Sequence, residues 1–328
     1  MSKLSFVAFA LTVATLAASG STNAHAQGAY PDRQIRIVVP VAPGGLADML
    51  ARAVGQQLGQ ELKQQVLIEN KPGGNFQIGI KEVLAAPADG YTLLVAQEGA
   101  IVLNPHLYST LSYDPLKDLA PISGIAKVDQ VLIVHPSVPA RDGKELIAYA
   151  KSRSGELSFG TFGPGSTPQL YMEMLHHMAG VQFVPVTYRG AAPMLSDVVA
   201  NHVPMTFISL GQALPLHKEG KVRIVAVCTA QRLEILPDVP TLAESGVPGF
   251  EATAWHGLFA KAGTPPEVLT RINAEIQRMG KDNEFKAKVL DPTFFRSMAS
   301  SRAEFESTIR LEAARWKSFV EAAKLRIE

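Results

Sequence analysis

The sequence predicts an α/β protein of two lobes, each a mainly parallel sheet flanked by helices, with a ligand cleft between the lobes. Its 328 residues exceed what one hydrophobic core usually organises, so we expect about two lobes. Short β-branched runs alternate with amphipathic helical runs, which is typical of βαβ units. The apolar fraction of 47% beside 19% charged residues is that of a folded globule.

The predicted strands are short apolar runs, and several have a helical run between them. They lie at 34–41, 65–69, 91–96, 130–135, 157–160, 183–187, 203–209, 222–228 and 255–260. Predicted helices at 46–62 and 169–178 each follow a strand. Beyond the last strand the pattern is helical only, at 265–279, 282–290 and 301–323.

Two weak interruptions, at 121–128 and 246–250, suggest that the chain leaves one lobe, builds the second and returns. This double crossover would form a hinge and a cleft. We therefore predict a first lobe of residues 27–127 and 252–328, and a second lobe of residues 128–251.

The N-terminal segment is predicted to be a secretory signal peptide. Lys3 precedes an uncharged apolar run at 4–18, and the segment ends at Ala24-His25-Ala26, so cleavage is expected before Gln27. A membrane anchor is the alternative, but this run of about 15 residues is shorter than the roughly 20 that cross a bilayer. We expect a periplasmic protein that is not inserted in the membrane once the signal is removed.

The predicted mature chain carries no net charge, because loss of Lys3 leaves 30 basic and 30 acidic residues. Nucleic-acid binding normally needs a clustered basic excess, so we expect no nucleic-acid partner. Cys228 is the single cysteine and lies in an apolar run, which predicts a buried, unreactive thiol.

Two Gly-rich corners join strands to helices and predict an anion site. The first, 40–48, contains Gly44 and Gly45 and places backbone N–H groups at a helix N-terminus. It lacks the lysine of a P-loop and the spacing of a dinucleotide site. The second, 159–168, offers Ser166 or Thr167 as a helix cap. Each corner alone could be a tight turn, but ligands of open α/β sheets bind at such strand ends.

Catalytic and metal sites have no support in the sequence. Ser166 is followed by Thr167 and Pro168, so the Gly-x-Ser-x-Gly elbow of serine hydrolases is absent. The histidines form no His-Glu-x-x-His pattern, and His176 and His177 point to different faces of one helix. We expect no cofactor and no metal.

Over nearly the whole predicted mature chain, the sequence resembles the periplasmic solute receptors of tripartite tricarboxylate transporters, the Bug receptors. The matching stretches are Tyr30-Pro-Asp-Arg-Gln-Ile-Arg-Ile-Val-Val-Pro40, Ala42-Pro-Gly-Gly-x-x-Asp48, Asn70-Lys-Pro-Gly-Gly74, Pro87-Ala-Asp-Gly-Tyr-Thr-Leu93, Tyr188-Arg-Gly190, Leu236-Pro-Asp-Val-Pro-Thr241, Trp255-His-Gly-Leu-Phe259 and Gly263-Thr-Pro265. Each is weak alone, and their order and spacing make the set specific.

The resemblance implies a type II periplasmic-binding fold in which loops of both lobes hold a carboxylate, partly through waters. It implies a monomeric receptor that delivers its ligand to the membrane permease of a tripartite transporter. The ligand-binding residues carried over are Pro43, Gly44, Gly45, Asp48, Gln97, Phe162, Gly163, Ser166, Thr167, Tyr188, Arg189, Gly190 and Ser209.

Departures from the family pattern leave the ligand open. Asn75-Phe76-Gln77 replaces a small, Gly-rich continuation, and Pro204 replaces an acidic residue. Phe162 suggests an apolar wall, which suits an aromatic carboxylate as well as a dicarboxylate. Two other functions remain, a sensor that docks to a signalling protein and an enzyme on the same fold.

Overall fold

A computed structural model describes residues 30–163 and 166–325. The residues from Arg33 onward form one compact unit, and all the elements below belong to it. The predicted signal peptide and its cleavage point lie outside the described residues. None of the described helices is both long enough and apolar enough to span a membrane.

The first part of the chain alternates strands and helices as predicted. Its elements are β1 (Ile35–Val39), α2 (Leu46–Leu62), β2 (Val66–Asn70), α3 (Gln77–Ala85), β3 (Thr92–Gln97), the π-helix η1 (Gly99–Leu103), α4 (Asn104–Leu107), α5 (Pro115–Asp118) and β4 (Leu119–Val134). β1 pairs in parallel with both β2 and β3, so the carboxyl ends of these three strands lie at one edge of the sheet.

The middle of the chain adds α6 (Gly143–Ser152), β5 (Ser158–Thr161), α7 (Thr167–Ala179), β6 (Val184–Thr187), α8 (Ala191–Val199), β7 (Met205–Ser209), α9 (Leu210–Lys218) and β8 (Arg223–Val227). β5 and β6 pair in parallel, whereas β7 and β8 both pair antiparallel with the later residues of β4.

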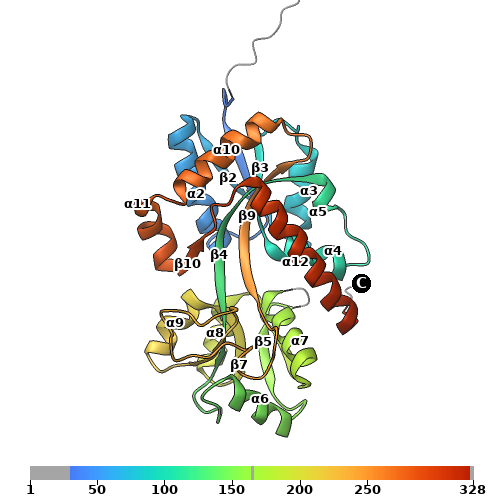
Figure 1. Ribbon diagram of the computed structural model, residues 1–328, viewed down its shortest axis with the longest axis vertical. Helices are drawn as coiled ribbons and strands as arrows, with labels where there is room; N and C mark the ends of the chain where they lie inside the picture. The colour runs from blue at the N-terminus through green and yellow to red at the C-terminus, as the bar shows by residue number, and fades with distance from the viewer. Residues whose placement is uncertain (1–29, 164–165, 326–328) are drawn as a thin grey trace, which may run out of the picture. The chain divides into compact units, whose positions relative to one another are not determined.

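The C-terminal part returns to the first sheet. It contains β9 (Thr253–Lys261), α10 (Pro266–Met279), α11 (Asn283–Phe285), the π-helix η2 (Lys286–Leu290), the 3₁₀-helix η3 (Asp291–Thr293), β10 (Phe295–Ser297) and α12 (Arg302–Ala323). Figure 1 shows β9 beside the long β4, with α12 crossing in front of the first sheet.

The main sheet is mixed, so the expectation of mainly parallel sheets is wrong for its centre. Its order is β10-β4-β9-β3-β1-β2. β4 leaves this sheet and β9 comes back into it, so β9 runs antiparallel to both β4 and β3. β10 is antiparallel to β4 as well. Parallel pairing is confined to strands whose connections are helical crossovers.

The interruption predicted at 121–128 lies inside β4 rather than between elements. The register of β4 against β9 shifts between Pro121 and Ser123 and again between Gly124 and Ala126. A β-bulge adds a residue and bends a strand without ending it. The small and cyclic residues that looked like a break therefore mark bulges, and β4 continues into the second half of the sheet.

The C-terminal segment contains a strand, contrary to the helical pattern predicted for it. β10 has only three residues, too few for a periodic signal, and it is held because Phe295 is buried and pairs with Val128. The helix predicted at 282–290 is divided into α11 and η2. The helices predicted at 265–279 and 301–323 are confirmed as α10 and α12.

The long strand β4 joins two halves of the sheet: the first contains β1, β2, β3, β9 and β10, and the second contains β7 and β8. One hydrophobic cluster extends through both halves. It contains Leu94 of β3, Leu132 of β4, Phe207 of β7 and Trp316 of α12. Its aromatic centre leaves no room for a side chain at Gly257, where a Cβ would collide with the ring of Phe305. α12 packs against η1, α4 and α7, so it contacts elements of both halves.

Candidate functional site

The carboxyl ends of strands from both halves converge on the middle of β4. The last residue of β3, Gln97, lies opposite His256 of β9, and His256 lies opposite Ala126 of β4. The last residue of β7, Ser209, lies opposite Gln130 of β4. Ala126 and Gln130 are four residues apart, about 13 Å at the rise of an extended strand. The loops that follow β1, β3 and β7 are thus brought to one level of the molecule.

The first corner, between β1 and α2, presents backbone groups to solvent. Pro43, Gly44 and Gly45 are exposed. Gly44 has a φ of 85°, a left-handed conformation that favours glycine. Gly45 is the N-cap of α2 and supplies no side-chain cap. Because the first N–H groups of a helix have no partner within it, this corner offers donors to an anion.

Asp48 holds the first corner in place. The residue is 3% exposed, and its carboxylate accepts hydrogen bonds from the Gly44 N–H at 2.9 Å, Arg52 Nε at 3.0 Å and Asn70 Nδ2 at 2.9 Å. Burial alone would raise the pKa of this carboxyl, but the bonds from Arg52, Gly44 and Asn70 hold its pKa below the ordinary value. Asp48 is therefore ionised and positions the loop.

The second corner, between β5 and α7, is held by hydroxyl groups. The Gly163 N–H donates to Thr161 Oγ1 at 3.1 Å, and Ser166 Oγ donates to the Gly163 carbonyl at 2.7 Å. Phe162 is 37% exposed. Ser166 occupies the N-cap position of α7, but neither it nor Thr167 provides the side-chain cap that we expected. The left-handed Gly163, with a φ of 100°, brings its carbonyl to the serine hydroxyl instead.

Two further corners begin at the ends of β6 and β7. Gly190 and Ser209 are the N-caps of α8 and α9, and neither helix has a side-chain cap. Ser209 Oγ bonds Gln212 Oε1 at 2.7 Å. Tyr188 packs on a second hydrophobic cluster, which includes Met194 of α8 and Ile208 of β7, and donates its hydroxyl to Asp197 at 2.8 Å. Burial and Asp197 raise the pKa of Tyr188 to about 12. Arg189 is exposed and has no ion pair with a described residue.

The helices of the four corners differ from several others in the described chain. α2, α7, α8 and α9 start without a side-chain cap, as do α3, α4 and α10. By contrast, α6 is capped by Asp142 and α12 by a Ser301–Glu304 capping box. Uncapped helix N-termini carry partial positive charge and free N–H groups, which suit a carboxylate.

Comparison with known proteins assigns the chain to a family. The family model described as "Tripartite tricarboxylate transporter family receptor" matches residues 50–325. The chain belongs to this receptor family. Among curated relatives, a UPF0065 protein "in tcbD-tcbE intergenic region" of Pseudomonas sp. is 36% identical over 81% of this chain and 79% of that protein. The BugT protein of Bordetella pertussis is 32% identical over 75% and 76%. The predicted resemblance is confirmed.

Solved structures of similar proteins agree on the fold. The structure of R. palustris Rpa4515 with adipate has a TM-score of 0.82 and 34% identity, covering 91% of this chain and all of that chain. MatC from Rhodopseudomonas palustris with bound malate has a TM-score of 0.79 and 28% identity, covering 89% and all of that chain. The protein therefore has the two-lobed α/β fold of periplasmic solute receptors, and its family consists of receptors.

A buried carboxyl that sequence reasoning missed follows Gln97 directly. Glu98 accepts a hydrogen bond from Trp316 Nε1 of α12 at 2.7 Å. In the same region Glu312 accepts from Trp255 Nε1 at 2.5 Å. Burial, together with the Glu312 charge, raises the pKa of Glu98 well above its ordinary value, although the bond from Trp316 opposes this.

The Glu98–Trp316 bond connects the end of β3 to α12, and α12 in turn contacts α7. The Trp316 ring stacks on Tyr171 of α7, with ring centroids 6.4 Å apart and planes 7° apart. α7 is the helix that begins at the second corner. The two tryptophans of the receptor thus both donate to glutamate carboxyl groups, a pattern that a single sequence does not reveal because the partners lie 57 and 218 residues apart.

His256 of β9 is buried, between β3 and β4 in the sheet, and is uncharged at neutral pH. Neither ring nitrogen has a hydrogen-bond partner among the described residues, and burial lowers its pKa to about 4. The described residues contain no group of three His, Cys, Asp or Glu side chains that could hold a metal ion. Cys228 is buried as predicted, and burial raises the pKa of its thiol.

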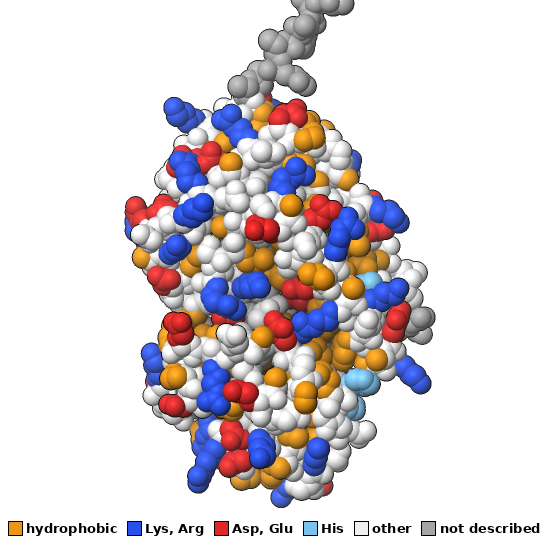
Figure 2. All heavy atoms as spheres, viewed as in Figure 1, with side chains coloured by type: hydrophobic (Ala, Val, Ile, Leu, Met, Phe, Trp, Pro, Cys, Tyr) orange, Lys and Arg blue, Asp and Glu red, His pale blue; other side chains and the backbone are white. Residues whose placement is uncertain are grey.

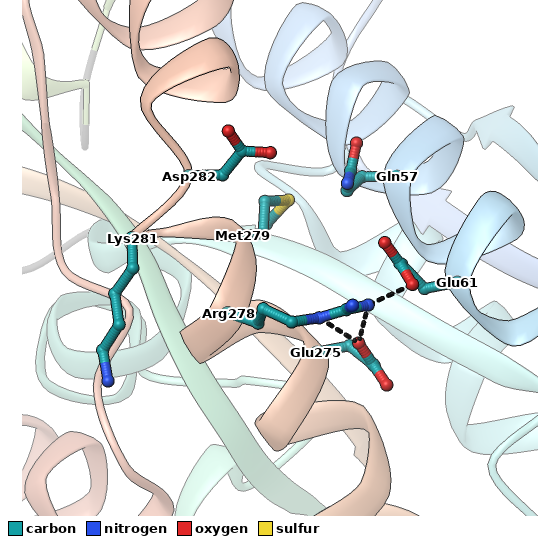
Figure 3. Close-up of a pocket in the computed structure, with 7 residues that line it drawn as sticks. All are labelled: Gln57, Glu61, Glu275, Arg278, Met279, Lys281 and Asp282. Atoms are coloured by element: carbon teal, nitrogen blue, oxygen red, sulfur yellow. Dashed lines mark hydrogen bonds and ion pairs between the residues drawn. The ribbon is translucent and has the colours of Figure 1, made fainter.

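A pocket between α2 and α10 does not fit an anionic ligand. Its cavity volume is about 300 Å³. Figure 3 shows Arg278 of α10 reaching across to Glu61 of α2, and Arg278 is ion-paired both with Glu61 and with Glu275, which lies one turn earlier in α10. Asp282 adds a further acid to the lining, with Lys281 as the second base. The charge of Arg278 is already neutralised by these two glutamates, so a carboxylate ligand would gain little binding energy in this pocket.

A larger pocket of about 720 Å³ lies along β4, β10 and the loop after β8. Arg296, one of the basic residues that line it, forms a bidentate ion pair with the buried Asp129, at 2.8 and 2.5 Å. The acids that line it outnumber the bases by one. Figure 2 likewise shows acidic and basic side chains interspersed over the visible face. The uncapped corners therefore remain the better candidate site.

Proposed function

We propose that this receptor binds a small organic carboxylate between loops of its two halves and delivers it to the membrane permease of a tripartite transporter. The observation that supports this proposal most is the set of four uncapped helix N-termini following β1, β5, β6 and β7. Such groups bind anions without a dedicated cation. Two proteins of similar structure have been solved with adipate and with bound malate.

The proposed binding residues come from two lobes. The first lobe is residues 27–127 with 252–328, and the second is residues 128–251. Pro43, Gly44, Gly45 and Gln97 would contribute from the first lobe, with Asp48 positioning the loop. The second lobe would contribute Phe162, Gly163, Ser166, Thr167, Tyr188, Arg189, Gly190 and Ser209. A ligand that contacts both lobes binds the closed arrangement better, so it shifts the receptor toward closure by its differential affinity.

Calorimetry and thermal unfolding with a panel of carboxylates test the proposal. A true ligand should stabilise the native protein by about 2.7 kcal/mol at a free concentration of about 100 times its dissociation constant. Mass spectrometry of the recovered compound should show it unchanged. Conversion of the compound would favour an enzyme, and a panel with no stabilising carboxylate would contradict the proposed ligand class.

Two substitutions at the corners separate backbone recognition from side-chain recognition. A Cβ at Gly45 would lie 3.9 Å from the Ala42 carbonyl oxygen, and Gly45 has a φ of −80°, so Gly45→Val should fold. A larger side chain there would block the approach of a carboxylate to the backbone, and we expect affinity to fall about a hundredfold, or ~2.7 kcal/mol. Ser166→Ala should weaken the free energy of ligand binding by only about 0.5–1.5 kcal/mol. Equal affinities of the two variants would contradict backbone recognition.

Delivery to a permease and export are tested in cells. We expect the mature protein to begin at Gln27 in a periplasmic extract, as measured by intact mass. Uptake of the identified ligand should require both the receptor and the permease. Normal uptake without the receptor, alongside loss of a ligand-induced transcriptional response, would favour the sensor role.

A further inference from the structure

The turn at 73–77, between β2 and α3, has an unusual backbone. Gly73, Gly74, Asn75 and Phe76 have φ values of 120°, 55°, 46° and 76°. Glycine adopts such angles readily, and asparagine tolerates them, but a bulky residue does so only when its surroundings impose it. Glycine would adopt the backbone conformation of position 76 with less steric strain than phenylalanine does.

Side-chain hydrogen bonds fix this turn to the segment that follows Gln97. Asn75 Nδ2 donates to Tyr108 Oη at 2.8 Å and to Asn104 Oδ1 at 3.2 Å. Asn104 is fully buried and donates back to the Asn75 carbonyl at 3.1 Å. Gln77 Oε1 accepts from Ser112 Oγ at 2.8 Å. The residues on both sides of Phe76 therefore anchor its backbone.

The turn also lies beside the first corner. A Cβ at Gly79 in α3 would approach Pro40 Cβ within 2.7 Å and the Lys71 carbonyl within 3.1 Å. Gly79 is in the first turn of α3, three residues after Phe76. β2 is parallel to β1 and in register with it, so its loop leaves the same edge of the sheet as 40–45. The turn that carries Phe76 is therefore bonded to the segment after Gln97 and leads into α3, which packs against Pro40 of the first corner.

Phe76 is half-buried, and its buried part packs on the main hydrophobic cluster. We propose that Phe76 is a specificity-determining wall of the ligand site and that it selects a carboxylate with an apolar body over a short, hydroxylated one. Together with Phe162 of the second corner, it would give the site one apolar surface from each half. This inference rests on the proposed function and adds the ligand class to it.

The test compares affinities for adipate and benzoate with the affinity for malate, measured by calorimetry. We expect the wild-type receptor to prefer at least one apolar-bodied acid over malate by about tenfold or more, the effect of burying a modest apolar area. Phe76→Gly should reduce that ratio about tenfold while changing malate affinity by less than about twofold. Phe76→Asn, which suits a left-handed backbone, should behave in the same way and serves if the glycine variant is unstable.

Phe294→Gly is the matched control, because Phe294 also has a left-handed backbone, with a φ of 54°, but lies before β10. It should leave the ratio of affinities unchanged. An unchanged ratio in both Phe76 variants, with wild-type binding intact, would overturn the role of Phe76 and leave the proposed function standing. Absence of wild-type binding to every carboxylate would instead contradict the proposed function.

Discussion

The two Gly-rich corners have the same place in their sheets but are held by different chemistry. The first is fixed by the ionised Asp48, which accepts from Gly44, Arg52 and Asn70. The second is fixed by neutral groups, with Thr161 Oγ1 bonding the Gly163 N–H and lying 3.0 Å from Ser166 Oγ. Both arrangements leave the helix that follows without a side-chain cap.

The difference indicates separate roles for the two corners. Hydrogen bonds to an ionised group are roughly twice as strong as those between neutral groups, so the first corner should keep its shape without a ligand. The second needs less energy to rearrange. We therefore expect the first corner to act as a fixed platform and the second as the part that adjusts when the ligand binds.

The largest effect should come from Asp48→Ala, which removes the charged anchor. Three donors lose their acceptor, and we expect the free energy of unfolding to fall by about 2–4 kcal/mol. Urea unfolding at neutral pH measures it. Met49→Ala, on an exposed neighbour in α2, should change stability by less than about 0.5 kcal/mol.

Acid should remove the Asp48 contribution from the wild-type protein. The folded-state pKa of Asp48 lies below its ordinary value of 3.8, so the stabilisation is complete above the unfolded pKa and is lost as pH falls through the folded one. The gap between wild type and Asp48→Ala should therefore narrow below about pH 4. A gap that stays constant into acid would mean that Asp48 acts through packing rather than charge.

Thr161→Val tests the neutral anchor and should have the next largest effect. Thr161 is fully buried, and the substitution leaves the Gly163 N–H without its acceptor. We expect the free energy of unfolding to fall by about 1–3 kcal/mol, with little change between neutral and acidic pH. Thr187→Val, at an exposed position of β6, is the control. A loss larger than that of Asp48→Ala would reverse the comparison between the corners.

Sequence periodicity was sufficient for the elements that carry the corners. β1 and β7 are short, mostly buried apolar runs. β5 and β6 have only four residues each, and β6 is largely exposed. Each of the four strands is followed by a turn that contains Gly or Ser. Runs of this kind report local burial, which depends on neighbours in the sequence. β10 and the bulges in β4 escaped prediction because pairing with distant residues, and not local pattern, determines them.

The side-chain roles within the corners were less predictable. The spacing of Asp48 placed it correctly in the first turn of α2, but its bonds to Gly44 and Asn70 depend on how β2 lies beside β1. Ser166 reached the N-cap position as expected, yet its hydroxyl bonds Gly163 because that residue is left-handed. Glu98 gave no sequence signal, since its partner Trp316 is 218 residues away.

The smallest expected effect is that of Arg189→Gln. It tests whether the second half of the molecule contributes a charged side chain to ligand binding. Arg189 is exposed and has no ion pair with a described residue, so the stability of the free receptor should change by less than about 0.5 kcal/mol. If the bound carboxylate reaches Arg189, an exposed ion pair of about 0.2–1 kcal/mol is lost, and affinity falls by a factor of roughly 1.4 to 5 at low salt. At about 0.5 M salt the Debye length is roughly 4 Å and the difference should shrink.

Calorimetry at the two salt concentrations, with Arg153→Gln as an exposed control in the same half, separates the outcomes for Arg189. A loss that disappears in salt means that a weak surface charge assists a site built mainly from backbone donors. A loss of tenfold or more that persists in salt means a desolvated ion pair, since buried pairs are screened much less. In that case the second half would contribute a charged group to the bound state. The contrast between a first corner fixed by a charge and a second corner fixed by neutral groups would then hold only for the empty receptor.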